Sequence, residues 1–262
     1  MATKAIAKKL YDGQYEVIFN PNARGRAPRY KVNGQAKKGV TTILGDTLAK
    51  KGLMTWPMDT ALKYIKEKLP VVTEADLEEA SMAYIHLRDA GGNSGTAAHE
   101  MVEDFLLGKE VVLSQDTGAN KAYHAFVKWF KETEPEVLGV ENVIYSKSLD
   151  YAGTYDFLIK VDGKVYLGDL KTTNPSREAP NGIYPENFFQ LGAYALAYME
   201  QREAEPDMPA IEDVMVVSCK KNGKVDIVTG QDVGLSINDT LEASRQVVSI
   251  WQMLQRLKGE LK

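Results

Sequence analysis

The sequence has few of the residues that tie a chain together covalently or through a metal cluster. Its 262 residues include one cysteine, Cys219, and three histidines. A single thiol excludes a disulfide framework, a zinc finger and an iron–sulfur cluster held by four thiolates. A chain of this length buries enough apolar surface to fold without such links. The scarcity of cysteine therefore favours a reducing, cytoplasmic location.

Long apolar segments are absent as well. The longest stretch without Asp, Glu, Lys or Arg runs from Asn187 to Met199, and its 13 residues are too few to cross a bilayer. The N-terminus is basic but lacks the apolar core of a secretory signal. The sequence contains no G-x-x-x-x-G-K-[ST] motif, which excludes an ATP-driven motor of that type. We therefore expect a soluble protein that uses neither a membrane nor ATP.

Charge is distributed unevenly along the chain. The net charge of −4 argues against a simple basic protein that coats nucleic acid. Residues 1–70 nevertheless carry 14 Lys and Arg against 5 Asp and Glu, or +9, whereas residues 71–262 carry 18 against 31, or −13. This division suggests a basic lobe for a polyanion and an acidic lobe for divalent cations. A solvated charged surface would give the same counts, so both interpretations stay open.

The first part of the chain reads as short strands followed by helices. Residues 1–45 contain short alternating segments, and residues 46–69 are typical of a helix that is interrupted near Thr55-Trp56-Pro57. Thr73 is a typical N-cap for a helix that ends near residue 89, after which the glycine-rich residues 91–95 are expected to break the chain. Further helices are predicted at 96–107 and 120–131.

The second part of the chain is rich in β-forming segments, and it defines the fold class. Asp150-Tyr151 and Asp162-Gly163 separate three such segments, and Asp162-Gly163 is typical of a tight hairpin. The predicted elements are strands at 140–148, 153–161 and 164–171, a helix at 187–202, strands at 211–218 and 224–229, and a helix at 237–257. The order helix, three strands, helix, strand predicts an α/β core with an N-terminal extension of mixed helices and strands.

Two acidic residues are expected to meet in this core. Asp169 and Lys171 lie on the same face of their strand, because side chains alternate along a strand. The hairpin at Asp162-Gly163 places Asp156 opposite or diagonal to Asp169. Two carboxylates beside one lysine suit a bound Mg²⁺ or Mn²⁺, which takes oxygen ligands and also binds phosphate. A surface ion pair is the simpler alternative, although the apolar flanks favour burial.

Two further pairs of residues stand four positions apart on predicted helices. His99 and Glu103 follow Gly95, and Gln190 and Tyr194 lie on the helix after the third strand. Residues at this spacing share one face of a helix. Each pair taken alone also fits a structural role, with the histidine as a satisfied helix residue and the second pair as surface and core residues.

The four patterns together carry more information than any one of them. G-T-x-x-H-x-x-x-E, G-T-x-D-F, G-D-L-K-T-T and Q-L-G-A-Y occur in this order over residues 95–194. This arrangement resembles the PD-(D/E)XK nuclease superfamily, in particular its RecB-like exonuclease branch, and most of all the phage and mitochondrial genome-maintenance exonucleases. Residues 40–44 with 53–56 are similar to the N-terminal part of those enzymes. The first word of the "PD" motif differs, because Tyr155 precedes Asp156.

The resemblance implies a restriction-endonuclease-like core and a role for each motif residue. His99, Asp156, Asp169 and the Leu170 carbonyl would hold one or two Mg²⁺ or Mn²⁺ ions, which bind phosphate and activate water. Lys171 would orient that water or stabilise the transition state. Glu103 would be an outer-sphere ligand or a water-mediated contact. Unlike some relatives, this chain cannot carry an iron–sulfur cluster, because it lacks the cysteines.

Other residues are expected to contact the substrate. The resemblance implies that Gln190 and Tyr194 position Lys171, the substrate phosphate or their own helix against the sheet. Thr172 and Thr173 are candidates for hydrogen bonds to phosphate, with capping of the strand end as the alternative. Four residues of the N-terminal extension are candidates for stacking on unpaired bases: Trp56, Tyr64, Tyr84 and Arg88. For the three aromatic residues, packing in the core is the alternative.

These expectations form one hypothesis for the whole chain. Residues 1–90 would be a basic, DNA-engaging extension packed on a nuclease core at 91–262, which includes the C-terminal helix. The protein would be a metal-dependent exonuclease that acts on single-stranded DNA or duplex ends in phage-type recombination, repair or genome processing. It would work in the cytoplasm of a bacterium or phage-infected host, with a single-strand-annealing or replication protein as partner. The alternatives are a structure-specific endonuclease on the same fold and a non-catalytic nucleic-acid-binding module.

Overall fold

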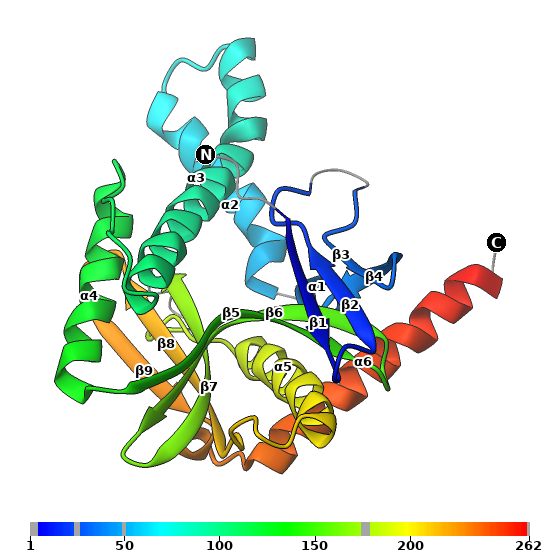
Figure 1. Cartoon of the computed structure of the whole chain (residues 1–262). Helices are drawn as coiled ribbons and strands as arrows, with labels where there is room; N and C mark the ends of the chain where they lie inside the picture. Colours follow the sequence, from blue (N-terminus) through cyan, green and yellow to red (C-terminus); the bar gives the residue numbers. More distant parts are fainter. Residues whose placement is uncertain (1–4, 24–26, 49–50, 174–178, 261–262) are drawn as a thin grey trace.

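Nine strands among the described residues pair into one mixed sheet (Figure 1). The computed structural model describes residues 5–23, 27–48, 51–173 and 179–260, and for residues 51–54 only the backbone. The strands are β1 (Ile6–Leu10), β2 (Tyr15–Phe19), β3 (Tyr30–Val32), β4 (Gln35–Gly39), β5 (Glu136–Ser146), β6 (Tyr151–Val161), β7 (Lys164–Thr173), β8 (Asp213–Lys220) and β9 (Val225–Thr229). The helices are α1 (Val40–Thr47), α2 (Lys51–Lys68), α3 (Glu74–Leu106), α4 (Thr117–Thr133), α5 (Pro185–Ala204), the 3₁₀ turn η1 (Gln231–Val233) and α6 (Ile237–Glu260).

The strand pairing leaves an opening beside the middle of β6. β5 pairs antiparallel with one edge of β6 along almost its whole length. The other edge is shared, because β4 pairs in parallel with Tyr151 and Ala152 whereas β7 pairs antiparallel from Phe157 onward. Residues 153–156 of β6 therefore lie between the ends of two different partners. Asp156 stands in this opening, and its side chain is partly buried.

Helices cover both faces of the sheet around β6, β7 and β8. On one face, α1, α5 and α6 pack around Leu167 and Val216. On the other face, α4 and the second half of α3 pack around Leu170 and Val217. Successive residues of a strand point to opposite faces, so β8 is buried throughout because both of its faces are covered. This α/β/α arrangement confirms the predicted α/β core.

The predicted hairpin between the second and third core strands is confirmed. Asp162 and Gly163 both have positive φ, at 49° and 84°, as a tight two-residue turn requires. β7 is parallel to β8, and α5 makes the crossover between them, as parallel neighbours require. The hairpin is therefore built locally, whereas β8 depends on the helix that carries the chain across the sheet.

The predicted break at residues 91–95 is wrong. α3 continues through this segment and runs from its capping box at Thr73 and Asp76 to Leu106. Each glycine in a helix interior costs up to about 1 kcal/mol relative to alanine. Packing offsets this cost, because Ser94 and Ala98 are buried and the helix after them joins the core around Leu170. The predicted division between residues 90 and 91 stays a prediction, and α3 passes through it.

The predicted interruption of the preceding helix near Pro57 is also wrong. α2 contains Pro57 within its 18 residues. A proline inside a helix removes one backbone hydrogen bond, and it makes the helical conformation unfavourable for the residue before it. The neighbouring Trp56 packs edge-on against Tyr84 of α3, with 4.9 Å between the ring centroids, and this contact supports the helix at that point.

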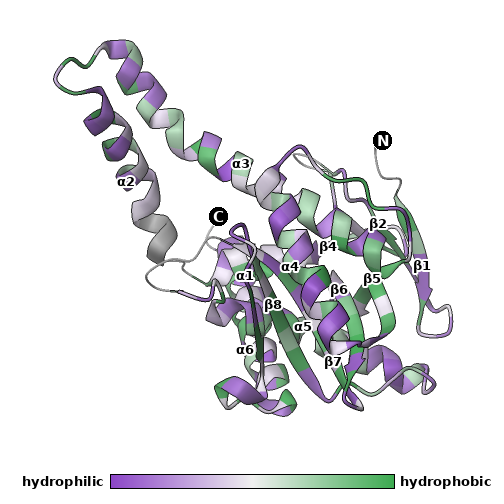
Figure 2. Ribbon diagram, turned by 90° about the vertical axis from the view of Figure 1, so that its left-hand side faces the viewer, coloured by the Kyte–Doolittle hydropathy of each residue, from purple (hydrophilic) through white to green (hydrophobic). Residues whose placement is uncertain are grey.

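α2 and the first half of α3 form a helical arm that projects from the sheet (Figure 2). Their mutual contact is the main support of the arm, and α2 is mainly hydrophilic along its length (Figure 2). The N-terminal strands, by contrast, are fixed to the core: Leu10 and Tyr11 pack with Val143 of β5, and the Tyr11 hydroxyl donates to the Tyr145 carbonyl at 2.7 Å. Within the described part of the chain, no helix has the length and hydropathy needed to cross a bilayer.

Candidate metal centre

Two aspartates meet where β6 and β7 begin to separate. Phe157 pairs with Gly168, so the next position on each strand brings Asp156 opposite Asp169. The Leu170 backbone N–H donates to Asp156 Oδ2 at 2.6 Å, which ties the Asp156 side chain to the D-L-K segment. The predicted proximity of the two acids therefore follows from the hairpin register.

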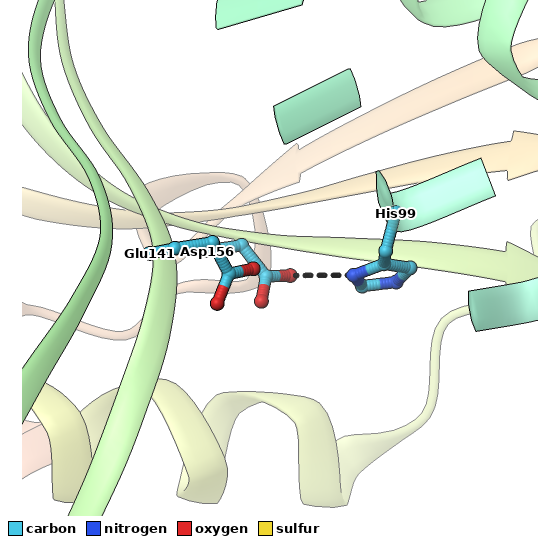
Figure 3. A group of neighbouring side chains, drawn as sticks. All are labelled: His99, Glu141 and Asp156. Atoms are coloured by element: carbon cyan, nitrogen blue, oxygen red, sulfur yellow. Dashed lines mark ion pairs between the residues drawn. The ribbon is translucent and has the colours of Figure 1, made fainter. Parts of the chain in front are cut away.

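His99 reaches the same place from α3. Its Nδ1 lies 3.6 Å from Asp156 Oδ2 (Figure 3). His99 also lines a small cavity together with Asp156 of β6 and Leu170 of β7, so the ring lies against both strands of the hairpin. The helix residue and the strand residues are far apart in sequence, and only the packing of α3 on the sheet brings them together.

Glu141 completes a group that the sequence analysis missed. One ligand atom from each of His99, Glu141 and Asp156 can be chosen so that all three lie within 4.8 Å of one another, and Figure 3 shows the three side chains gathered in one place. Glu141 lies on β5, whose neighbours Val140 and Asn142 pair with Phe157 and Tyr155. No sequence motif contains Glu141, and its place beside Asp156 follows from the observed antiparallel pairing of β5 and β6.

Lys171 is part of a second group of polar contacts beside the first. Its Nζ lies 2.5 Å from Asp169 Oδ2 and donates to Gln190 Oε1 at 3.3 Å. The Gln190 amide nitrogen donates to Asp169 Oδ1 and to the Tyr194 hydroxyl, both at 3.0 Å. Asp169 and Lys171 of the third motif and Gln190 and Tyr194 of the fourth motif therefore form one chain of polar contacts.

Gly153 allows Tyr194 to reach this group. A Cβ at Gly153 would lie 2.6 Å from Cε1 of the Tyr194 ring, which is closer than real Cβ contacts come. The glycine of the G-T-x-D-F pattern thus gives space to the tyrosine of the Q-L-G-A-Y pattern. Because the two motifs are about 40 residues apart in the sequence, this relationship is visible only in the folded protein.

Burial and mutual repulsion make this an unfavourable place for so many carboxylates without a cation. Burial and, after it, the neighbouring Asp156 raise the pKa of Asp169 to about 6, against the opposing effect of Lys171. The pKa values of Asp156 and Glu141 are also raised, in both cases first by burial. Burial and then the positive charge of Lys171 lower the pKa of His99 to about 4, so the imidazole is neutral and its lone pair is free near pH 7.

These donors fit a divalent cation. Carboxylate oxygens and a neutral imidazole are ligands that Mg²⁺ and Mn²⁺ accept, and a cation among the acids would favour their ionised forms. A cavity of about 10 Å³ lies between His99, Glu103, Glu141 and Asp156. This volume is about that of one water-sized sphere, so it has room for a single small ion or water.

The remaining predicted residues lie at different distances from this centre. Glu103 lines the same small cavity one turn after His99, and burial raises its pKa. Thr172 stands against α3, where a Cβ at Gly95 would be 3.1 Å from its hydroxyl, while the Thr173 hydroxyl lies 3.1 Å from that of Ser218. Both threonines therefore have protein neighbours of their own.

The predicted stacking residues are not brought to the metal centre by any described contact. Trp56 packs against Tyr84 on the helical arm, and the Arg88 guanidinium lies 5.9 Å from the Tyr84 ring centroid. Tyr64 lies under Lys68 of the same arm, with 5.4 Å between Nζ and the ring centroid. Their predicted role on unpaired bases stays a prediction.

A larger cavity lies beside Lys171. Its volume is about 270 Å³, and Lys171 and Gln190 line it together with Thr173, Asn187 and Thr41 of α1. The preceding residue, Leu170, lines the small cavity instead. The D-L-K segment therefore contributes neighbouring residues to the two cavities.

Comparisons with known proteins agree with this geometry. The family model described as the PD-(D/E)XK nuclease superfamily matches residues 94–258. Because this match covers more than half of the chain, the protein belongs to the PD-(D/E)XK nuclease superfamily, and its α/β/α core is a restriction-endonuclease-like fold. Divalent metals are generally used by nucleases of this superfamily, and the donor group around Asp156 is of that kind.

The solved structures that resemble this chain do so distantly. SSO0001 matches at 11% identity with a TM-score of 0.33, over 74% of this chain and 85% of that one. The alkaline exonuclease LHK-Exo from Laribacter hongkongensis matches at 10% identity with a TM-score of 0.30, over 86% of this chain and 95% of that one. A structure of LHK-Exo in complex with dAMP gives the same values. No curated protein matches the sequence.

Proposed function

We propose that this protein is a metal-dependent DNA exonuclease of the RecB-like branch, which hydrolyses phosphodiester bonds from DNA ends. The observation that carries the proposal is the convergence of His99, Asp156, Asp169 and Lys171, which come from α3, β6 and β7, at one opening of the sheet. A non-catalytic binding module has no physical need for a partly buried lysine held beside two aspartates whose pKa values are raised.

Each residue at the opening has a distinct part in the proposed mechanism. His99, Asp156, Asp169 and the Leu170 carbonyl would hold one or two Mg²⁺ or Mn²⁺ ions, which supply charge neutralisation at phosphate and an acidified water. Lys171 stands as a fixed cation to orient the attacking water or to stabilise the charge that develops on phosphate. Glu103 would act through water from the rim of the small cavity.

The substrate is proposed to enter on the side of Lys171 that faces the larger cavity. Gln190 holds the lysine there, and the hydroxyls of Thr172 and Thr173 are proposed to donate to phosphate oxygens near it. Residues 1–70 carry a charge of +9, so the N-terminal extension would contribute phosphate contacts, with Trp56 and Arg88 on the arm as contacts for unpaired bases. The biological setting proposed is phage-type recombination, repair or genome processing in the cytoplasm, with a single-strand-annealing or replication partner.

An assay with linear and circular DNA of one sequence tests the proposal. Single strands labelled at the 5′ or the 3′ end are incubated with the protein and Mg²⁺ or Mn²⁺, beside the circular strand and an EDTA control, and a linear duplex is treated in parallel. We expect loss of linear DNA, no loss of the circle, and no reaction in EDTA. The label released first reports the polarity of cleavage.

The other outcomes of this assay contradict the proposal in different ways. Cutting of the circular strand assigns the protein to the endonucleases on the same fold. Binding of DNA with no cleavage of single strands or duplex ends, at any metal concentration, assigns it to the non-catalytic modules.

A further inference from the structure

Glu141 is held in a backbone conformation that residues with a side chain seldom adopt. Its φ is +46°, in the left-handed region, and β5 shifts its register just before it, between Val137 and Gly139. Non-glycine residues are strained in this region and persist there where the surrounding structure imposes the conformation. Here the surrounding β5–β6 pairing places Glu141 opposite Asp156, and its carboxylate lies beside that of Asp156 (Figure 3).

The Glu141 carboxylate has no hydrogen bond or ion pair among the described residues, although it is partly buried. Asp169 is different, because one of its oxygens accepts from Gln190 and the other pairs with Lys171. Asp156 also has a protein donor, the Leu170 N–H. Glu141 therefore shares with Glu103, on the rim of the small cavity, oxygens that are not committed to protein groups, and of these two acids it is Glu141 that lies within 4.8 Å of ligand atoms of His99 and Asp156.

The small cavity gives these oxygens a place to meet a cation. Its polar lining consists of His99, Glu103, Glu141 and Asp156, and its volume of about 10 Å³ leaves room for one small ion. Donor atoms of His99, Glu141 and Asp156 lie within 4.8 Å of one another. Two ligands on opposite sides of Mg²⁺ or Mn²⁺ are about 4 Å apart, so small side-chain movements close this group around an ion.

We infer that Glu141 is a direct ligand of the catalytic cation, and that it forms with His99 and Asp156 a three-residue site that binds the ion before DNA arrives. The four sequence motifs contain no residue of β5, so this ligand lies outside the pattern by which the family resemblance is recognised. The inference rests on the proposed function, because it concerns the ion that the nuclease would use.

Cation binding without DNA tests the inference independently of cleavage. Mn²⁺ is titrated into the protein in the absence of DNA, and free Mn²⁺ is followed by electron paramagnetic resonance. We expect Glu141→Gln to weaken Mn²⁺ binding about tenfold or more, because loss of even an outer-sphere partner of a metal site weakens binding by about 10- to 100-fold. Asp156→Asn serves as the positive control.

The matched control is Glu136→Gln, at the exposed start of the same strand, which should leave Mn²⁺ affinity unchanged. Glu141→Asn is a second variant, because asparagine tolerates left-handed φ and its shorter side chain withdraws from the cavity; circular dichroism and thermal melting verify that each variant is folded. Cleavage by Glu141→Gln should recover partly at high Mn²⁺ concentration.

The outcomes separate the inference from the proposed function. If Glu141→Gln and Glu141→Asn bind Mn²⁺ like the wild type while Asp156→Asn binds weakly, the inference is wrong and the proposed nuclease stands. If the wild type itself binds no Mn²⁺ and cleaves no DNA, the proposed function fails as well.

Discussion

Gln190 joins the two charged groups of the D-L-K motif. Its amide oxygen accepts from the Lys171 ammonium and its amide nitrogen donates to Asp169. The oxygen of an amide accepts hydrogen bonds and its nitrogen donates them. The Gln190 amide can therefore bind the ammonium and the carboxylate at the same time in only one orientation. Tyr194 accepts the other amide hydrogen and thereby fixes that orientation. The fourth motif thus holds the ammonium of the third.

The Lys171→Ala variant should fold and bind DNA but lose cleavage. The expected loss is about 10²- to 10³-fold, the effect of removing one preorganised charge from a transition state. Single-turnover cleavage rates and DNA-binding titrations measure the two properties separately. Lys160→Ala, an exposed lysine on β6, is the control and should leave cleavage unchanged. Cleavage at the wild-type rate by Lys171→Ala would remove the lysine from the mechanism.

At the scale of elements, α3 is continuous through a segment that local sequence disfavours. Gly91 and Gly92 are exposed in the middle of this helix, and a Cβ at either position would meet no atom within 4 Å. Gly91→Ala and Gly92→Ala should therefore each stabilise the protein by about 0.5–1 kcal/mol, because alanine loses less backbone entropy in a helix. Chemical denaturation measures the change in the free energy of unfolding. No gain at either position would indicate that the chain is not helical there.

Gly192 gives the opposite expectation on α5. A Cβ at this position would lie 2.2 Å from the Ser244 hydroxyl and 2.3 Å from the Thr240 carbonyl oxygen, both on α6. The carbonyl belongs to the backbone and cannot rotate away, so α5 and α6 would have to separate. We expect Gly192→Ala to lower the free energy of unfolding by about 1–3 kcal/mol, as overpacking does in other cores. The same denaturation experiment gives this value, and a stabilised variant would contradict the close packing of the two helices.

At the scale of the whole molecule, the single cysteine reports on global unfolding. Cys219 lies on β8 under α4, is 1% exposed, and its pKa is raised by burial to about 12. At pH 8 only about one thiol in 10⁴ would be ionised, and the thiolate is the reactive form. We therefore expect no reaction of the native protein with a thiol reagent, and one thiol per chain in denaturant. Rapid labelling of the native protein would show that β8 is exposed by local opening.

Short-range chemistry in the sequence determined one half of the candidate metal centre. Asp162 and Gly163 form the tight turn that their residue types favour, and a two-residue hairpin leaves one register in which Asp156 faces Asp169. Strand alternation likewise placed Asp169 and Lys171 together, and helical spacing placed Gln190 with Tyr194. These relationships depend on residues that are close together in the sequence, so the sequence pattern predicts them.

Only the tertiary structure decided the other half. Glu141 reaches the opening because β5 changes register before it and holds it at positive φ. Glutamate does not favour this conformation, so the residue type does not predict it. His99 arrives because α3 stays helical across its glycines and packs on the sheet, where burial of Ala98 and its neighbours offsets the helical cost of those glycines. Such contacts are stabilised by burial of apolar surfaces that are far apart in the sequence, and this stabilisation outweighs the local helix propensity of the glycines.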